Sequence, residues 1–405
     1  MKSNKIKIIF LMGFLFFNCF YISLKAIDYP LEIDAIKIRF NYDLNSYSHD
    51  ALSITTGYSN PIIVIEDEWD IDEGHDYPIA YIKGQTSRRI KVTFRHNQDQ
   101  SRSYTFLMAG YVDQGTSFGD AWSTSVYFPS NNNGISNEIT YQLHGSVPNS
   151  VGKRYARFMW ECIDYGAEYF WTEHDYYTLL AAPQAPMAIP WTTVLDNACV
   201  WASGQTSSEN AANDITNCLF TCGFDYDTGS GAPRYGGWST FNLTQFLSEL
   251  GSSYDVNCLD MGKAVTTFGN AIGCGLYLTT FSGGLSLNCI DPIGAALPTN
   301  NPFSSPLIGN DCRYGGFSYH AFSQNSSKNT WDACLKYDID GDPDNVTGSN
   351  PGCGSTTTGY SWILPSNEQE STYIQRLLDY WTTWENCSNP YNCGYFTYQR
   401  AFSVN

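Results

Sequence analysis

A cysteine at the predicted start of a helix is the side chain best placed to act as a nucleophile. Residues 256–274 read VNCLDMGKAVTTFGNAIGC, and their apolar members recur at intervals of three and four, which predicts one face of a helix ending at Gly273. Cys258 begins this helix and Asn257 is a suitable cap. The unpaired amides and the positive end of the helix dipole would favour a thiolate, the form of cysteine that attacks carbonyl groups. A disulfide is the ordinary alternative for such a cysteine.

A cysteine nucleophile needs a base, and the second half of the chain contains a single histidine, His320. It lies in GGFSYHAF, where the alternation of residues predicts a strand, and after a polar run the segment TWDACLKYD resumes an extended pattern. A hairpin centred on Ser326 would place Asp332 opposite His320. A carboxylate there would hold the imidazole in one tautomer and stabilise its charged form, the third role in a catalytic triad.

These segments resemble the transglutaminase-like branch of the papain-like cysteine enzymes. The resemblance covers roughly residues 191–340 and is carried by two pairs of motifs. The first pair is NCLDM with GNAIG downstream, and the second is YHAF followed by WDACLKYD. It implies a cysteine that opens a helix, a histidine on a following strand and an aspartate on the next strand, here Cys258, His320 and Asp332. A proline often follows the carboxylate in that family. Here alanine follows Asp332, which leaves Asp338 as the substitute.

Other residues compete for parts of this site. Cys199 lies in ACVWA, which faintly resembles the cysteine-tryptophan-alanine run of papain, but it falls late in its predicted helix, where the dipole gives no help. We expect the backbone amide of Cys258 to serve as an oxyanion donor. The family resemblance adds an upstream aromatic residue, either Tyr235 or Trp238, for which core packing is the ordinary alternative.

An acidic run, DIDGDPDN, follows the predicted strands. Its carboxylates at Asp338, Asp340, Asp342 and Asp344 suit a hard cation, so calcium is one expectation and a solvated acidic turn is the other. The run departs from an EF-hand, because Pro343 stands at the glycine position and Ser349 at the closing glutamate. The proposed chemistry itself requires no cofactor. The chain also lacks HExxH, a phosphate-binding glycine loop and CxxC, which argues against zinc peptidases, nucleotide enzymes and thioredoxin-like catalysts.

The N-terminus predicts export. Residues 1–26 begin with three lysines, continue with an unbroken apolar run from Ile8 to Phe17 and offer Ala26 as a small cleavage residue, with an uncleaved membrane anchor as the alternative. Loss of this segment removes four lysines and no acids, so the net charge falls from −18 to −22, which argues against nucleic-acid partners. Twelve cysteines remain, eleven of them after residue 190. In an oxidising compartment we expect disulfides, and the odd number leaves one thiol over.

The pattern of elements predicts an α+β protein with two domains. Residues 27–180 show short strands separated by polar turns, at 36–40, 61–65, 89–94, 104–109 and 154–160, typical of an antiparallel immunoglobulin-like β-sandwich, as one unit or two. Residues 181–190, AAPQAPMAIP, form a stiff linker. Residues 191–405 form the transglutaminase-like domain, with helices at 191–202, 208–219, 242–250 and from 258, strands at 275–281, 316–322 and 330–337, and a last helix that Ser366 and Gln369 cap.

Two functions from different classes follow. The first is a secreted or surface-exposed cysteine enzyme that acts on the amide bonds of a protein or peptide substrate through an acyl-enzyme, with hydrolysis favoured over crosslinking. The second is a non-catalytic binding or adhesion protein, associated with the cell surface or cell wall, in which the same fold is a scaffold and Cys258 is held in a disulfide. The oxidation state of Cys258 separates the two.

Overall fold

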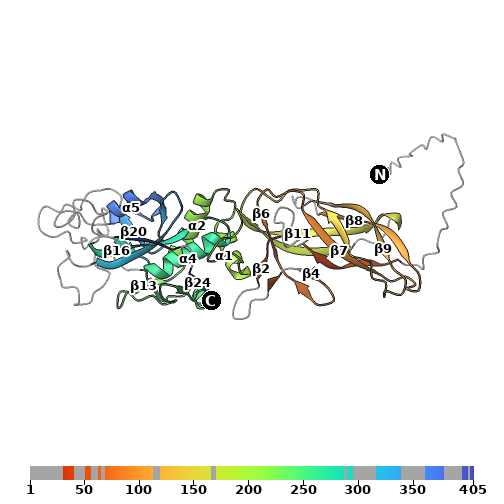
Figure 1. Ribbon diagram of the computed structural model, residues 1–405, viewed down its shortest axis with the longest axis horizontal. Coiled ribbons are helices and arrows are strands. Elements are labelled where there is room, and N and C mark those ends of the chain that lie inside the picture. The colour runs from red at the N-terminus through yellow and green to blue at the C-terminus, as the bar shows by residue number, and fades with distance from the viewer. Residues whose placement is uncertain are drawn as a thin grey trace, which may run out of the picture.

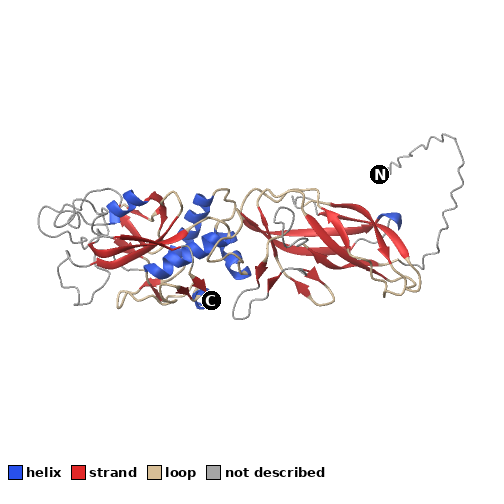
Figure 2. Cartoon of the chain, viewed as in Figure 1, coloured by secondary structure: helices blue, strands red, loops and turns tan. Residues whose placement is uncertain are grey.

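The chain forms an elongated molecule with a strand-only half and a mixed half. The computed structural model describes residues 31–40, 51–55, 63–64, 69–112, 119–165, 170–286, 290–294, 316–338, 361–377, 395–399 and 402–405. The strands of the first half lie at one end of the molecule, and all α-helices of these residues lie in the second half (Figures 1 and 2). The predicted α+β class is therefore confirmed. No helix within these residues is long and apolar enough to cross a membrane. The predicted export segment, residues 1–26, lies outside them.

Two five-stranded sheets make up the first half. Their strand orders are β10-β7-β1-β4-β5 and β6-β12-β11-β8-β9, and a two-stranded β2-β3 pair lies apart from both. All their pairings are antiparallel except that of β6 with β12. The strands are β1 (Ile33–Arg39), β2 (Ile54–Thr55), β3 (Ile63–Val64), β4 (Trp69–Asp70), β5 (His75–Asp76), β6 (Ile79–Ile82), β7 (Arg89–His96), β8 (Tyr104–Val112), β9 (Ala121–Phe128), β10 (Ile139–Gln142), β11 (Gly152–Cys162) and β12 (Phe170–Leu179), with a 3-10 turn η1 (Ile163–Tyr165).

One hydrophobic core fills the space between these sheets. Residues of β7 alternate between buried and partly exposed, as expected for a strand with one face on a core. Phe94 of β7 meets Trp160 of β11 edge to face across the sandwich, with ring centroids 5.4 Å apart. The strand pattern of the sequence thus belongs to one sandwich within the described residues, not to two smaller units.

The described residues of the second half form five helices, a five-stranded sheet and several smaller sheets. Its helices are α1 (Thr192–Trp201), α2 (Ser208–Phe220), α3 (Leu243–Glu249), α4 (Cys258–Ala271) and α5 (Glu370–Leu377). A five-stranded sheet has the order β22-β19-β18-β16-β23, a three-stranded sheet the order β17-β20-β21, and β13 pairs with β15 and β14 with β24. The strands are β13 (Asp225–Tyr226), β14 (Thr240–Phe241), β15 (Asp255–Val256), β16 (Tyr277–Ser286), β17 (Ile290–Pro292), β18 (Gly316–Gln324), β19 (Asn329–Trp331), β20 (Leu335–Asp338), β21 (Trp362–Ile363), β22 (Ser366–Gln369), β23 (Tyr395–Gln399) and β24 (Ser403–Val404).

Helix α4 runs through the centre of the second half, and every one of its residues is buried. Its apolar face, predicted from the sequence, packs into the main core, where Met261, Val265 and Phe268 have no exposed surface. Gly262 lets the helix approach the sheet, since a Cβ there would lie 2.9 Å from Leu278 Cδ1 and 3.2 Å from the backbone nitrogen of Phe322. The central helix therefore has a fixed position against β18.

The proline-rich segment 181–190 is held against the end of α4. The amide of Gln184 donates to the carbonyl of Asn270 at 3.0 Å, and the Asn270 side chain donates to the carbonyl of Ala185 at 2.6 Å. Gly273 has a φ of +85°, and a Cβ there would lie 2.5 Å from the Ala181 carbonyl oxygen. A glycine after α4 thus serves both as the helix stop and as the contact point for this segment.

Two predicted elements of the second half are wrong. The expected single strand 330–337 is two strands in different sheets, β19 and β20, because the chain turns at Asp332, whose amide donates to the Pro365 carbonyl and whose carboxylate accepts the amide of Cys334. The expected helix start at Ser366 is instead strand β22, which pairs with β19, and α5 begins at Glu370. The turn at Asp332 thus divides the first element, and pairing of β22 with β19 outweighs the local helix pattern in the second.

Candidate active site

The start of α4 is capped in two directions. The Asn257 side chain accepts hydrogen bonds from the amides of Leu259 and Asp260 at 2.9 and 3.1 Å, and the Asp260 carboxylate accepts the Asn257 amide at 3.2 Å. This is a complete capping box, so the predicted cap at Asn257 is confirmed. Cys258 is the first residue of the helix, at the positive end of its dipole, and is 3% exposed.

The imidazole of His320 lies beside both Cys258 and Asp332. It projects from β18, has no exposed surface, and its Nε2 is 2.8 Å from Asp332 Oδ2. Burial alone would lower the pKa of His320, but the Asp332 carboxylate and a hydrogen bond with the Cys258 thiol outweigh it and raise the pKa to about 10. The ring is therefore cationic at neutral pH, and its charge would stabilise negative charge on the sulfur.

Asp332 lies directly after β19 and not opposite His320 in a strand pair. Ser323 pairs with Trp331, so the hairpin is centred on Ser327, one residue later than the sequence predicts. The physical reason is Asn325, whose side chain accepts the amides of Ser327 and Asn329, each at 3.0 Å, and so fixes a longer turn. The predicted register is wrong, yet the carboxylate reaches the imidazole from the turn that follows the strand.

Side chains of α4 also bond to β18, which fixes the distance between Cys258 and His320. Ser323 of β18 donates its hydroxyl to the Gly262 carbonyl at 2.8 Å, and its Oγ lies 2.8 Å from Thr266 Oγ1. Gly262 and Thr266 follow Cys258 in α4, and Ser323 follows His320 in β18. The nucleophile and the base are therefore carried by elements that contact each other directly.

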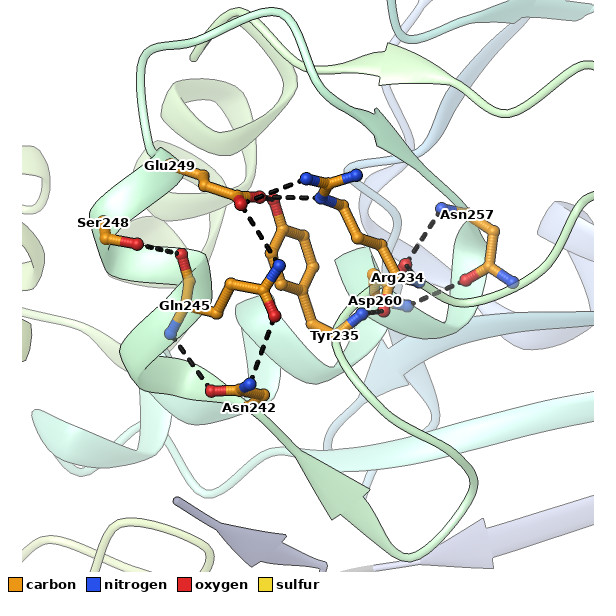
Figure 3. Close-up of polar contacts among 8 residues, drawn as sticks. All are labelled: Arg234, Tyr235, Asn242, Gln245, Ser248, Glu249, Asn257 and Asp260. Carbon is orange, nitrogen blue, oxygen red and sulfur yellow. Dashed lines mark hydrogen bonds and ion pairs between the residues drawn. The ribbon is translucent and has the colours of Figure 1, made fainter. Parts of the chain in front are cut away.

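The polar face of α4 holds the loop that precedes β14. Figure 3 shows Asp260 beside the backbone of Arg234 and Tyr235, whose amides donate to its two carboxylate oxygens at 2.8 and 3.0 Å. Burial raises the pKa of Asp260 to about 6, although these amides oppose the shift. Lys263, one turn on, donates to the carbonyls of Gly237 and Thr240, and burial lowers its pKa to about 8. Two amides and two carbonyls of residues 234–240 thus bind the side chains of Asp260 and Lys263.

The two aromatic residues considered for an oxyanion site lie in this loop and differ in their surroundings. The hydroxyl of Tyr235 donates to Glu249 Oε2 at 2.7 Å, within the cluster drawn in Figure 3, and its ring is fully buried. Trp238 is 50% exposed and its ring lies 4.6 Å from that of Tyr319. The hydroxyl of Tyr319 in turn accepts a hydrogen bond from Asn257 at 3.2 Å. Tyr235 is thus linked to the first turn of α4 through its backbone amide and Asp260, and the Trp238 ring is linked to the helix start through Tyr319 and Asn257.

The competing cysteine lies on another helix, and most of the acidic run lies outside the described residues. Cys199 lies late in α1 with no exposed surface, and burial raises the pKa of its thiol. Asp338 ends β20, and the remaining carboxylates predicted to bind calcium, at 340, 342 and 344, lie outside the described residues. No group of three metal-ligating side chains occurs within the described ranges. The calcium site stays a prediction.

The described cysteines are all free thiols. They are Cys162, Cys199, Cys218, Cys222, Cys258, Cys274 and Cys334. The predicted disulfides are therefore not seen among these seven, and the other cysteines of the chain fall outside the described residues. Cys258 is one of the free thiols and is buried.

Two neighbours of the cluster could not be predicted from the sequence. Tyr373 of α5 donates its hydroxyl to Asp332 Oδ2 at 2.7 Å, and Tyr226 of β13 has its pKa raised far above its ordinary value by burial and by the nearby Cys258. Both are 5% exposed or less. Each lies on a short element far from the others in sequence, so only the fold brings them to the site.

The chain is similar to a solved structure but matches no known sequence family. No protein-family model matches the chain, and no curated protein matches it. Among solved structures it is similar to red sea bream transglutaminase, with a TM-score of 0.33 and 9% identity, over 72% of this chain and 51% of that one. The chain thus spans about half the length of that enzyme. A likeness of this size supports no conclusion about the fold or the activity of this chain.

The raised pKa of His320 makes the stability of the protein depend on pH. A histidine whose pKa is about 10 when folded and 6.5 when unfolded stabilises the fold fully below pH 6.5, and this contribution is lost as pH rises through 10. We expect the gap in urea midpoint between the wild type and His320→Gln to be widest near pH 6 and to narrow by pH 10. A gap that does not change with pH would contradict the ionic His320–Asp332 pair.

Proposed function

We propose that the chain is an exported, transglutaminase-like cysteine enzyme that cleaves amide bonds of a protein or peptide substrate. The observation that carries the proposal is the 2.8 Å contact of His320 Nε2 with Asp332 Oδ2 beside the thiol of Cys258. Export rests on the sequence of residues 1–26, and mature protein with a mass that begins near Ile27 would support it.

The acylation step uses the sulfur of Cys258 and the proton of His320. The sulfur of Cys258 attacks the amide carbonyl carbon, and the carbonyl oxygen gains negative charge that the Cys258 amide at the start of α4 is placed to stabilise. The C–N bond then breaks, and His320 gives its proton to the leaving nitrogen, so an amine or ammonia departs and a thioester remains. Asp332 keeps the ring oriented and balances its charge.

Water completes the cycle in the favoured reaction. His320, now neutral, takes a proton from water as its oxygen attacks the thioester carbonyl, and the C–S bond breaks to release the carboxylic acid and regenerate Cys258. A primary amine in place of water would form a new amide instead. The low exposure of Cys258, 3%, means that a substrate must displace neighbouring side chains to reach the sulfur.

The binding-protein alternative requires Cys258 to be held in a disulfide. The free thiol of Cys258 and the charged pair beside it support the enzyme instead. No separate observation favours a particular binding partner in the second half of the chain.

The test is a product analysis with a glutamine-containing peptide. We expect ammonia and the glutamate product from the mature protein in water, and little incorporation of an added fluorescent primary amine, because hydrolysis is the proposed outcome. The reaction should be absent in Cys258→Ser. Incorporation of the amine without glutamate formation would change the assignment to crosslinking, and no turnover of glutamine peptides or unfolded protein substrates would contradict the proposal.

A further inference from the structure

Asp332 Oδ2 receives two side-chain hydrogen bonds, of which only one comes from the base. His320 Nε2 lies 2.8 Å from this oxygen, and the Tyr373 hydroxyl donates to the same atom at 2.7 Å. The other oxygen, Oδ1, accepts the backbone amide of Cys334 at 2.8 Å. The carboxylate is therefore held at both oxygens, and Tyr373 shares with His320 the oxygen that faces the imidazole.

The hydroxyl of Tyr373 keeps its hydrogen bond to Asp332 Oδ2 across the neutral pH range. Its side chain has no exposed surface, and burial together with the nearby Asp332 carboxylate raises the pKa of its hydroxyl far above the ordinary value. The hydroxyl thus keeps its proton and acts as a donor. The ring is fixed by its packing, edge to face against Phe322 with centroids 4.9 Å apart, and tilted against Tyr337 at 6.1 Å.

We propose that Tyr373 is a positioning residue that limits how strongly Asp332 holds the proton of His320. A carboxylate oxygen that accepts a hydrogen bond from a neutral hydroxyl has part of its negative charge stabilised, and so attracts an imidazolium less. The proton of His320 is then released more readily to a leaving nitrogen. The catalytic role of Tyr373 rests on the proposed function. The effect of Tyr373 on the titration of His320 can be measured without any activity.

Besides Asp332, the ionisable group that interacts directly with the imidazole is Cys258 on α4. Further ionisable groups interact with Cys258, with Asp332 or with one another, and they are common to every variant used below: Asp260 on α4, Cys334 before β20, Tyr226 on β13 and Tyr319 on β18. Since none of them is changed, a difference in the titration of His320 between variants reports on the substituted tyrosine.

The experiment is an NMR titration of the His320 ring nitrogens in the full mature chain. Tyr373→Phe removes the hydroxyl and keeps the ring, and we expect the His320 titration to move upward by about 0.5–1 pH unit. The high-pH transition in the rate of Cys258 alkylation by iodoacetamide, plotted against pH, should move in the same direction. Tyr337→Phe is the matched control, because Tyr337 is a buried neighbour whose hydroxyl bonds to Glu368 and not to Asp332, and it should leave both profiles unchanged.

A second test moves the His320 titration in the opposite direction and keeps the hydroxyl group in place. Incorporation of 3-fluorotyrosine at position 373 makes the hydroxyl a stronger donor with little change in size, so the His320 titration should move downward. An unchanged titration in both position-373 variants, or an equal shift in Tyr337→Phe, would overturn the proposal. Neither the titration nor the alkylation requires turnover, so their failure is distinct from a failure to find amidase activity.

Discussion

Replacement of Cys258 by alanine is expected to abolish amide cleavage and to leave the fold intact. Without the sulfur there is no acyl-enzyme, and loss of a nucleophile that acts in concert with its base costs on the order of 10⁴- to 10⁶-fold in kcat. Alanine suits a helix start that Asn257 already caps, and the side chain lost is small. Ammonia release from a glutamine peptide measures the activity, and urea unfolding measures the stability.

Cys199→Ala is the matched control for this change. Both cysteines are buried in helices, but Cys199 lies late in α1 within the core. We expect this variant to keep its activity apart from a modest loss of stability. Should Cys199→Ala be the inactive variant, the nucleophile would be reassigned. Should Cys258→Ala lose about 2–5 kcal/mol of stability, as for a broken disulfide, the scaffold alternative would be favoured.

The second large effect is expected at the histidine and its carboxylate. His320→Ala removes the group that carries the proton, and we expect a loss of about 10³- to 10⁵-fold in kcat/KM. Asp332→Asn keeps the shape and can still accept the Tyr373 hydroxyl, but its neutral amide no longer stabilises the imidazolium, so we expect a smaller loss of about 10²- to 10⁴-fold. Peptide hydrolysis between pH 5 and 10 measures both.

The double variant makes this prediction sharper. If His320 and Asp332 act as one unit, then His320→Ala with Asp332→Asn should be little worse than His320→Ala alone. Losses that multiply would show that Asp332 acts elsewhere. Equal activity of Asp332→Asn and the wild type would remove Asp332 from the site.

The sequence predicts the start of the candidate site well because local signals determine it. Asn257 followed three residues later by Asp260 is a capping pattern, and the spacing of Met261, Val265 and Phe268 defines a helix face, so the structure of α4 follows from residues close together in the chain. The position of Cys258 at the helix start needed no tertiary information.

Features that depend on tertiary contacts could not be predicted in this way. Asp260 and Lys263 are buried in α4 although both can carry charge, because residues 234–240 supply amides to Asp260 and carbonyls to Lys263. The late start of α5 follows from the pairing of β22 with β19. The hairpin register is different in kind, because it follows from a local turn in which the Asn325 side chain accepts two amides. Tyr373 could not be assigned to the site, since nothing local marks a tyrosine that bonds to a carboxylate 41 residues away.

The central claim is that Cys258 is a reactive thiol paired with His320. The most direct test is the rate of iodoacetamide modification of each cysteine in the native, unreduced protein as a function of pH, measured by peptide mass spectrometry. We predict that Cys258 is modified first at pH 6, where ordinary thiols react slowly, and that His320→Ala removes this early reaction. A Cys258 that is blocked in a disulfide, or that reacts only as pH approaches 8–9 like an ordinary thiol, would contradict the claim.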